Sequence, residues 1–154
     1  MPRTAGSQAN YTGSNLEDFV ESWVAKAGYQ RVRRTEFIAA KYLEQPIYAN
    51  QFYLGQSVYA TPLKCDFVLF HPEKWPQCLI IEAKWQQSGG SVDEKYMYLV
   101  THIQERYPWD TIIVLAGEGY RPGAETWLRS QVGKRLIAVY NMAQFQTWAN
   151  RGNL

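Results

Sequence analysis

The sequence predicts an α/β fold in which a mixed β-sheet is flanked by helices. Segments with helical hydrophobic spacing alternate with short apolar segments typical of strands, in the order helix, strands, helix, strand, helix, strand, helix. Hydrophobic residues make up 46% and aromatic residues 15% of the 154 positions, which is typical of a packed domain rather than a disordered chain. No window approaches the roughly 18 unbroken apolar residues of a membrane span, so we expect no membrane partner.

The first part of the chain divides into a flexible arm and the start of a domain. We expect residues 1–13, which are mostly small and polar, to form the arm, and residues 14–154 to form a single domain that begins with a helix. Ser14 followed by Glu17 matches a capping box, and Gly28 is a natural stop. The apolar residues of this helix recur at the spacing of one buried face, and they are Leu16, Phe19, Val20, Trp23, Val24 and Ala27.

The clearest strands lie in the centre of the chain. Residues 29–64 have no clean periodicity, and we expect short strands and a long loop there. Residues 65–70 and 78–85 are rich in apolar and β-branched side chains, and Pro72 and Pro76 mark a turn between them. The two strands should therefore form an antiparallel hairpin.

The remaining elements alternate between helices and strands. Pro and Gly residues mark the boundaries of these elements. The strand 111–116 is continuously apolar, which is typical of a sheet that is covered on both faces. We expect a helix over 89–107, a strand over 111–116, a helix over 122–132, a strand over 136–140 and a final helix capped by Asn141.

The charge balance alone does not identify a partner. The net charge is only +2, but five basic residues face one acidic residue between positions 26 and 41, and four face one between positions 121 and 135. Such stretches can contact phosphates. They can equally be solvated faces of the protein.

The residues that carry chemistry are Asp66, Glu82 and Lys84. Side chains alternate along a strand, so Glu82 and Lys84 emerge on the same face of the strand 78–85. The expected hairpin brings Asp66 of the partner strand close to them. Two carboxylates at one place repel each other unless a cation or a proton lies between them. Hard oxygen ligands without Cys or His nearby favour Mg²⁺ or Mn²⁺, and Lys84 could orient a water or balance charge on a phosphate.

The sequence gives less support to a structural ion pair, a zinc site or a nucleotide-binding site. Without Asp66, the pair Glu82 and Lys84 would simply be an exposed ion pair at a strand end. The two histidines are isolated and the two cysteines lack CxxC spacing, so a zinc site is improbable. No dinucleotide, Walker or serine-hydrolase motif is present, so we expect no nucleotide cofactor. The absence of a leader sequence and the low cysteine count predict a cytoplasmic protein.

The sequence resembles the PD-(D/E)XK nuclease superfamily, whose core is restriction-endonuclease-like. The matching residues are Asp66 and the segment Glu82-Ala83-Lys84, within the order helix, strand, strand, strand, helix, strand. The resemblance implies that Asp66 and Glu82 bind a divalent metal and that Lys84 assists the attacking water. It also implies phosphodiester hydrolysis that leaves 5′-phosphate and 3′-hydroxyl ends. Glu17 matches a further acid that many members carry on the first helix, although a capping box explains it equally well. Cys65 stands where the motif's proline would be.

We expect DNA as the substrate and an endonuclease as the activity. Arg31, Arg33 and Arg34 are the predicted nucleic-acid contacts, together with the aromatic loop 42–59. Two further candidate contacts are Gln86 and Lys95, and each could instead be a solvated side chain.

Several alternatives for the activity stay open. One active site cuts one strand, so double-strand cleavage would require two copies of the protein. A homodimer is therefore one hypothesis for the active form. A catalytically inactive binding module with the same fold and an unrelated α/β ligand-binding domain are the competing functions. The sequence leaves open DNA against RNA, endonuclease against exonuclease, and the biological role.

Overall fold

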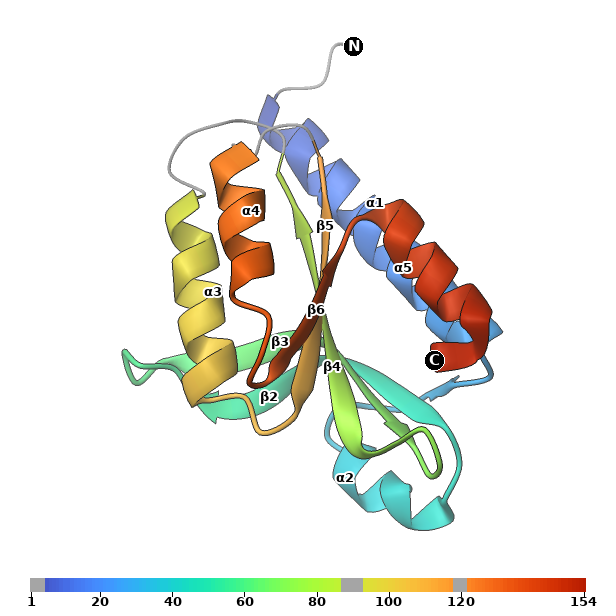
Figure 1. The fold of residues 1–154 in the computed structure, drawn as a ribbon. Helices are drawn as coiled ribbons and strands as arrows, with labels where there is room; N and C mark the ends of the chain where they lie inside the picture. Colours follow the sequence, from blue (N-terminus) through green and yellow to red (C-terminus); the bar gives the residue numbers. More distant parts are fainter. Residues whose placement is uncertain (1–4, 87–92, 118–121) are drawn as a thin grey trace.

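A computed structural model describes residues 5–86, 93–117 and 122–154. Their centre is a six-stranded mixed sheet in the order β1-β2-β3-β4-β5-β6, with helices on both faces (Figure 1), which confirms the predicted fold class. The strands are β1 (Gln30–Arg31), β2 (Ile47–Gln56), β3 (Pro62–His71), β4 (Trp75–Trp85), β5 (Asp110–Ala116) and β6 (Leu136–Tyr140). The last three run parallel to one another, whereas β2, β3 and β4 form an antiparallel meander that contains the predicted hairpin.

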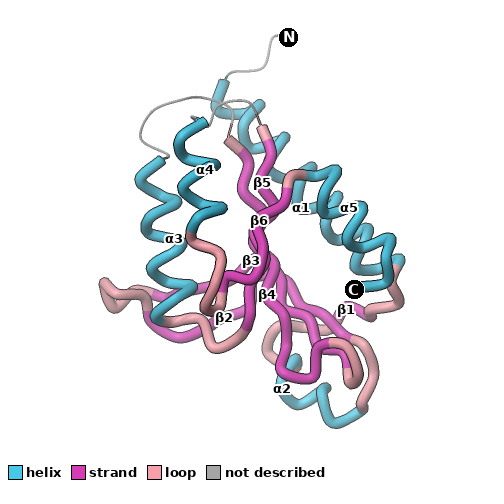
Figure 2. The backbone as a smooth tube through the Cα atoms, in the orientation of Figure 1, coloured by secondary structure: helices cyan, strands magenta, loops and turns pink. Residues whose placement is uncertain are grey.

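The helices form two layers, one on each face of the sheet. Helices α3 and α4 cover one face and α1 and α5 cover the other (Figures 1 and 2), and each pair contributes to its own hydrophobic cluster. The helices are α1 (Ala5–Lys26), α2 (Phe37–Ala40), η1 (Lys41–Leu43), α3 (Asp93–Glu105), α4 (Pro122–Ser130), α5 (Met142–Trp148) and η2 (Ala149–Asn153). Within the ranges given above, no helix combines the length and the hydrophobicity of a membrane-spanning segment. The expected start of α3 near residue 89 lies outside the described residues.

Helix α1 differs from the prediction at its N-terminal end. It begins at Ala5, inside the segment 1–13 that we expected to be a flexible arm. Ser14 is therefore in the middle of the helix, and the capping-box interpretation of Ser14 and Glu17 is wrong. The predicted buried face is confirmed, since Leu16 and Val20 lie in the hydrophobic cluster between α1 and the sheet.

The hairpin of β3 and β4 is paired along only part of its length. The register runs from His71 opposite Trp75 to Phe67 opposite Ile81 and goes no further. Beyond Phe67, β3 stays paired with β2, whereas β4 stays paired with β5 beyond Ile81. The sheet therefore splits into two diverging pairs of strands, as Figure 1 shows. We call this opening the fork.

Candidate active site at the fork of the sheet

The first residues of the fork are Asp66 on β3 and Glu82 on β4. The backbone N–H of Ala83 has no ladder partner on β3 and instead donates a hydrogen bond of 2.8 Å to Asp66 Oδ2. The Nζ atom of Lys84 lies 3.3 Å from Asp66 Oδ2 and 3.2 Å from Glu82 Oε2. One ammonium group thus bridges two carboxylates from different strands, and the three residues singled out from the sequence lie together.

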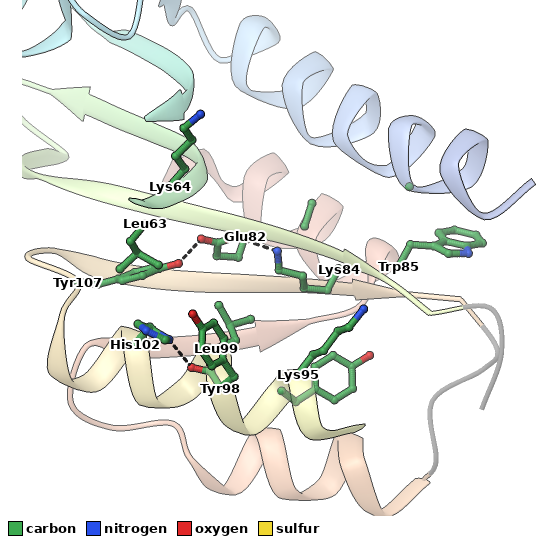
Figure 3. Close-up of a pocket in the computed structure, with 13 residues that line it drawn as sticks. Leu63, Lys64, Glu82, Lys84, Trp85, Lys95, Tyr98, Leu99, His102 and Tyr107 are labelled. Carbon is green, nitrogen blue, oxygen red and sulfur yellow. Dashed lines mark hydrogen bonds and ion pairs between the residues drawn. The ribbon is translucent and has the colours of Figure 1, made fainter. Parts of the chain in front are cut away.

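Glu82 is held in a buried position by Tyr107. Its exposed fraction is 1%, and the Tyr107 hydroxyl donates a hydrogen bond of 2.5 Å to Oε1. Lys84 and Tyr107 flank the carboxylate from opposite sides (Figure 3). Burial raises the pKa of Glu82 to about 8, although the nearby Lys84 charge works in the other direction. Tyr107 was not predicted from the sequence, because a tyrosine at an apolar helical spacing is typical of a core residue.

Lys84 remains a cation in this environment. Burial alone would lower the pKa of its ammonium group, but the carboxylates of Glu82 and Asp66 outweigh that effect and raise the pKa above the usual value. The side chain is 35% exposed, so it can reach a bound ligand. Lys84 is therefore suited to donate hydrogen bonds and positive charge rather than to accept a proton.

Glu17 approaches the same site from helix α1. It is partly buried, and its pKa is raised first by burial and then by the negative charge of Asp66, while Lys84 lowers it. This coupling places Glu17 in the electrostatic field of Asp66 and Lys84. Since Ser14 does not cap the helix, the interpretation of Glu17 as a helix-capping residue no longer competes with a role at the site.

A polar network that was not predicted from the sequence surrounds Asp66. Gln51 Nε2 donates a hydrogen bond of 3.4 Å to Asp66 Oδ1. Next to it, Asn50 Nδ2 and the Tyr48 hydroxyl donate to the two carboxylate oxygens of Glu21, at 2.8 Å and 3.1 Å. No sequence signal singled out these two amides, because Gln51 is exposed and Asn50 is only partly buried, as amide side chains commonly are.

The fork opens into a cavity of about 650 Å³ beside Glu82 and Lys84. Lysine and aromatic side chains from β3, β4 and α3 surround it (Figure 3). Its lining residues are Gly13, Leu63, Lys64, Glu82, Ala83, Lys84, Trp85, Lys95, Tyr96, Tyr98, Leu99, His102 and Tyr107.

Two predicted contact residues from this part of the chain have different outcomes. Lys95 is exposed and lines the cavity, as a ligand contact requires. Gln86 is 2% exposed and accepts a hydrogen bond from the Tyr96 hydroxyl, so its predicted contact with nucleic acid is not supported. The chain packs tightly there, since Gly117 has a φ of +100° and any side chain on it would overlap the backbone of Gln86.

The three predicted arginines lie together in a second depression, the arginine groove, of about 600 Å³. It is lined by Arg31, Val32, Arg33, Arg34, Thr35, Asn50 and Gln51. Gln51 connects this groove to the acids, because its side chain donates to Asp66 while its carbonyl oxygen accepts a hydrogen bond of 3.4 Å from Arg34. The arginine groove is thus directly adjacent to the fork.

The donor atoms at the fork fit a hard divalent cation. Asp66 and Glu82 supply carboxylate oxygens, and Mg²⁺ is commonly held by one or two carboxylates together with substrate phosphates. No group of three His, Cys, Asp or Glu side chains able to hold a metal occurs in the part of the chain that the structure describes. A cage made wholly of protein ligands is therefore not present among those residues, and the substrate would complete the coordination.

A mixed sheet that splits to present two acids and a lysine defines a restriction-endonuclease-like protein. A family model described as a PD-(D/E)XK nuclease superfamily domain matches residues 8–153, and the chain belongs to this superfamily. Neither a search of curated proteins nor a search of solved structures finds a match. The family thus supports a nuclease-like function.

Proposed function

We propose that this protein is a divalent-metal-dependent endonuclease that hydrolyses phosphodiester bonds in DNA. The observation that carries the proposal is the Lys84 ammonium group, which lies within 3.3 Å of carboxylates from two strands at the mouth of a cavity. A purely structural ion pair would not require a partly exposed lysine beside a cavity of this size. Membership of the nuclease superfamily supports the same conclusion.

Each residue of the site has a separate role in the proposed reaction. Asp66 and Glu82 would hold Mg²⁺ or Mn²⁺, which when bound polarises the phosphate and lowers the pKa of a water molecule. Lys84 presents positive charge to the phosphate and a hydrogen-bond donor to the attacking water. Tyr107 fixes the orientation of Glu82 through its hydrogen bond, and Glu17 adds negative charge near Asp66.

The substrate would bind across the fork and the arginine groove. Arg31, Arg33 and Arg34 line the groove, and Lys95 lines the cavity, so cationic side chains flank the acids from both directions. Such side chains contact phosphates without reading the base sequence. Binding should therefore weaken steeply as the salt concentration rises.

A cleavage assay tests this function. Plasmid, linear duplex, single-stranded DNA and RNA are incubated with the protein in Mg²⁺, Mn²⁺ or EDTA, and we expect DNA cleavage with either metal and none in EDTA. Lys84→Ala should lower the rate by about 10²–10³-fold, the typical cost of removing one preorganised charge donor. The exposed Lys134, which does not line the cavity, provides the matched control Lys134→Ala. Cleavage by Lys84→Ala at the parental rate would overturn the assignment.

The oligomeric state is tested in the same assay. Since one site cuts one strand, we expect a nicked plasmid at low protein concentration. Linear product should appear with a steeper concentration dependence if two copies act together. Linear product that forms in proportion to protein concentration from the start would argue against a homodimer.

A further inference from the structure

We infer that the exposed tyrosine pair beside the active-site cavity takes an unstacked nucleobase, so that the preferred substrate carries a single-stranded segment next to the site of cleavage. This inference rests on the proposed function and names its substrate class. Its starting point is an exposed pair of aromatic rings. Tyr98 on α3 lines the cavity, and Tyr59 on the turn between β2 and β3 stacks on Tyr98 from outside the cavity lining.

The two tyrosine rings form a ready-made stacking surface. Their planes differ by only 9° and their centroids are 6.0 Å apart. Tyr59 is 74% exposed and Tyr98 is 41% exposed, so the stack presents an open aromatic face to solvent. An isolated exposed tyrosine needs no explanation, but two parallel rings at the mouth of a cavity match the way proteins stack on the bases of single strands.

The stacking surface is held in place before any ligand binds. His102, which is 1% exposed, accepts a hydrogen bond of 3.1 Å from the backbone N–H of Val58 through Nε2. Its other ring nitrogen, Nδ1, is therefore the protonated one and donates to the Tyr98 carbonyl oxygen at 2.8 Å. His102 thus ties the turn to α3 across the open side of the fork. A rigid platform loses little conformational entropy on binding.

The turn that carries Tyr59 has its own internal support. The Ser57 hydroxyl accepts hydrogen bonds from the backbone N–H groups of Tyr59 and Thr61, at 3.1 Å and 3.3 Å. Ser57 is only 3% exposed, so these bonds are shielded from water. The position of the exposed ring is consequently set by the turn and by His102 together.

The charge of the cavity suits a nucleotide rather than a purely apolar ligand. Lys64 and Lys95 line it beside Lys84, while Leu63 and Leu99 supply apolar wall. Phosphates can meet the lysines while a base meets the rings. In a duplex the faces of each base are already covered by their neighbours, so only a single-stranded or unpaired base can extend the stack on Tyr59.

Binding measured without cleavage tests the inference separately from the nuclease activity. Fluorescence anisotropy in EDTA compares a single-stranded oligonucleotide with the blunt-ended duplex that it forms with its complement. Tyr59→Ala should weaken binding of the single strand by about 10-fold, which lies within the roughly 1–3 kcal/mol attributed to stacking of one base. Binding of the duplex should not change, and Tyr59→Phe should bind as the parent does.

Two controls make the result specific. Val132 is 43% exposed and belongs neither to the cavity lining nor to the tyrosine pair, so Val132→Ala should leave binding of the single strand unchanged. An oligonucleotide with a single abasic position at the binding site should lose affinity for the parent protein and lose nothing further with Tyr59→Ala. Equal weakening of single strand and duplex by Tyr59→Ala, or no weakening of either, would overturn the inference. A failure of metal-dependent cleavage with this binding pattern intact would overturn the proposed function alone.

Discussion

The two halves of the β3–β4 hairpin have different roles although the same two strands form both. In the closed half, between the turn and Phe67, cross-strand pairs such as Val68 with Ile80 are fully buried, and the register shifts once, between Leu69 and His71. In the open half, beyond Phe67, the strands part and carry Asp66, Glu82 and Lys84. The change takes place within a single residue position along each strand.

This difference shows how charged groups can be kept inside a fold. In the closed half the backbone satisfies its own hydrogen bonds, and the side chains contribute only apolar burial. In the open half the N–H of Ala83 lacks a ladder partner, and the Asp66 carboxylate takes that place. Residues that stabilise the sheet and residues suited to chemistry are thus separated along one hairpin. Substitutions in the two halves should have separable effects.

The largest effect is expected from Glu82→Gln in the open half. This change removes the carboxyl group that would hold the metal but keeps the shape of the side chain, and we expect nuclease activity to fall by about 10³-fold, roughly 4 kcal/mol. The free energy of unfolding should change by about 1 kcal/mol or less, because Lys84 keeps Asp66 as a partner at 3.3 Å and no buried charge is left without a counter-charge. Initial cleavage rates in Mg²⁺ and urea unfolding curves check both parts. A large loss of stability would mean that the two halves are not separable.

The opposite pattern is expected from Ile81→Ala, the last paired residue of the closed half. Ile81 is fully buried, so the change should lower the free energy of unfolding by about 2–5 kcal/mol. The cleavage rate per folded molecule should stay within a few-fold of the parent. Ile81→Val, which removes a single methylene, should cost only about 0.5–1.5 kcal/mol. A 100-fold loss of activity in folded Ile81→Ala would show that the closed half shapes the site directly.

Tyr107→Phe should give an intermediate result, because this residue joins the site to the core. The change removes the hydrogen bond to Glu82 Oε1 and leaves the ring in place. We expect about 1.5–3 kcal/mol less stability, the usual size of one lost hydrogen bond to a charged group, and about a 10-fold lower rate. Urea unfolding and initial rates measure the two effects. An unchanged rate would mean that Tyr107 only fills space.

The smallest effect is expected at the turn of the closed half, where His71 titrates. Its Nδ1 accepts hydrogen bonds from the backbone N–H groups of Glu73 and Lys74, at 3.1 Å and 3.0 Å. Burial, together with the charge of Lys74, lowers the pKa of His71 below its usual value of 6.5. The unfolded chain therefore binds a proton more readily, so this contribution is complete above pH 6.5 and is lost as the pH falls below that value.

His71→Asn isolates this contribution, since an amide oxygen can accept the same hydrogen bonds without titrating. As the pH falls from 8 to 5, the urea midpoint of the parent should decrease more than that of the variant. Urea unfolding across that range measures it. Parallel pH profiles for the two proteins would show that His71 does not contribute.

Those parts of the fold whose residues follow one regular period were predictable from the sequence. Strands β5 and β6, the hairpin and the Asn141 cap of α5 fall in this class. Short strands and a long loop were expected over 29–64, and the ten-residue length of β2 was missed because Gln51 has a φ of 52°, which interrupts the alternation of side chains. Ala49 and Phe52 consequently pack into the same hydrophobic cluster although a strict two-residue period would separate them. The start of α1 was missed because residues 5–13 carry no apolar stripe.

The site was predictable to the extent that it is local. Asp66, Glu82 and Lys84 lie on one hairpin, so strand alternation and turn position were enough to bring them together. Gln51 and Tyr107 reach Asp66 and Glu82 from outside the hairpin, and no period in the sequence predicts such contacts.

The placement of the acids on one hairpin also affects the order in which the protein assembles. Hairpins generally close within about 1–10 μs, and a short closed loop costs less chain entropy than a long one. The carboxylates of β3 and β4 should therefore meet early during folding, before the N-terminal helix docks and delivers Glu17. A variant that slows the docking of this helix would populate a species with two of its acids assembled and the third still absent.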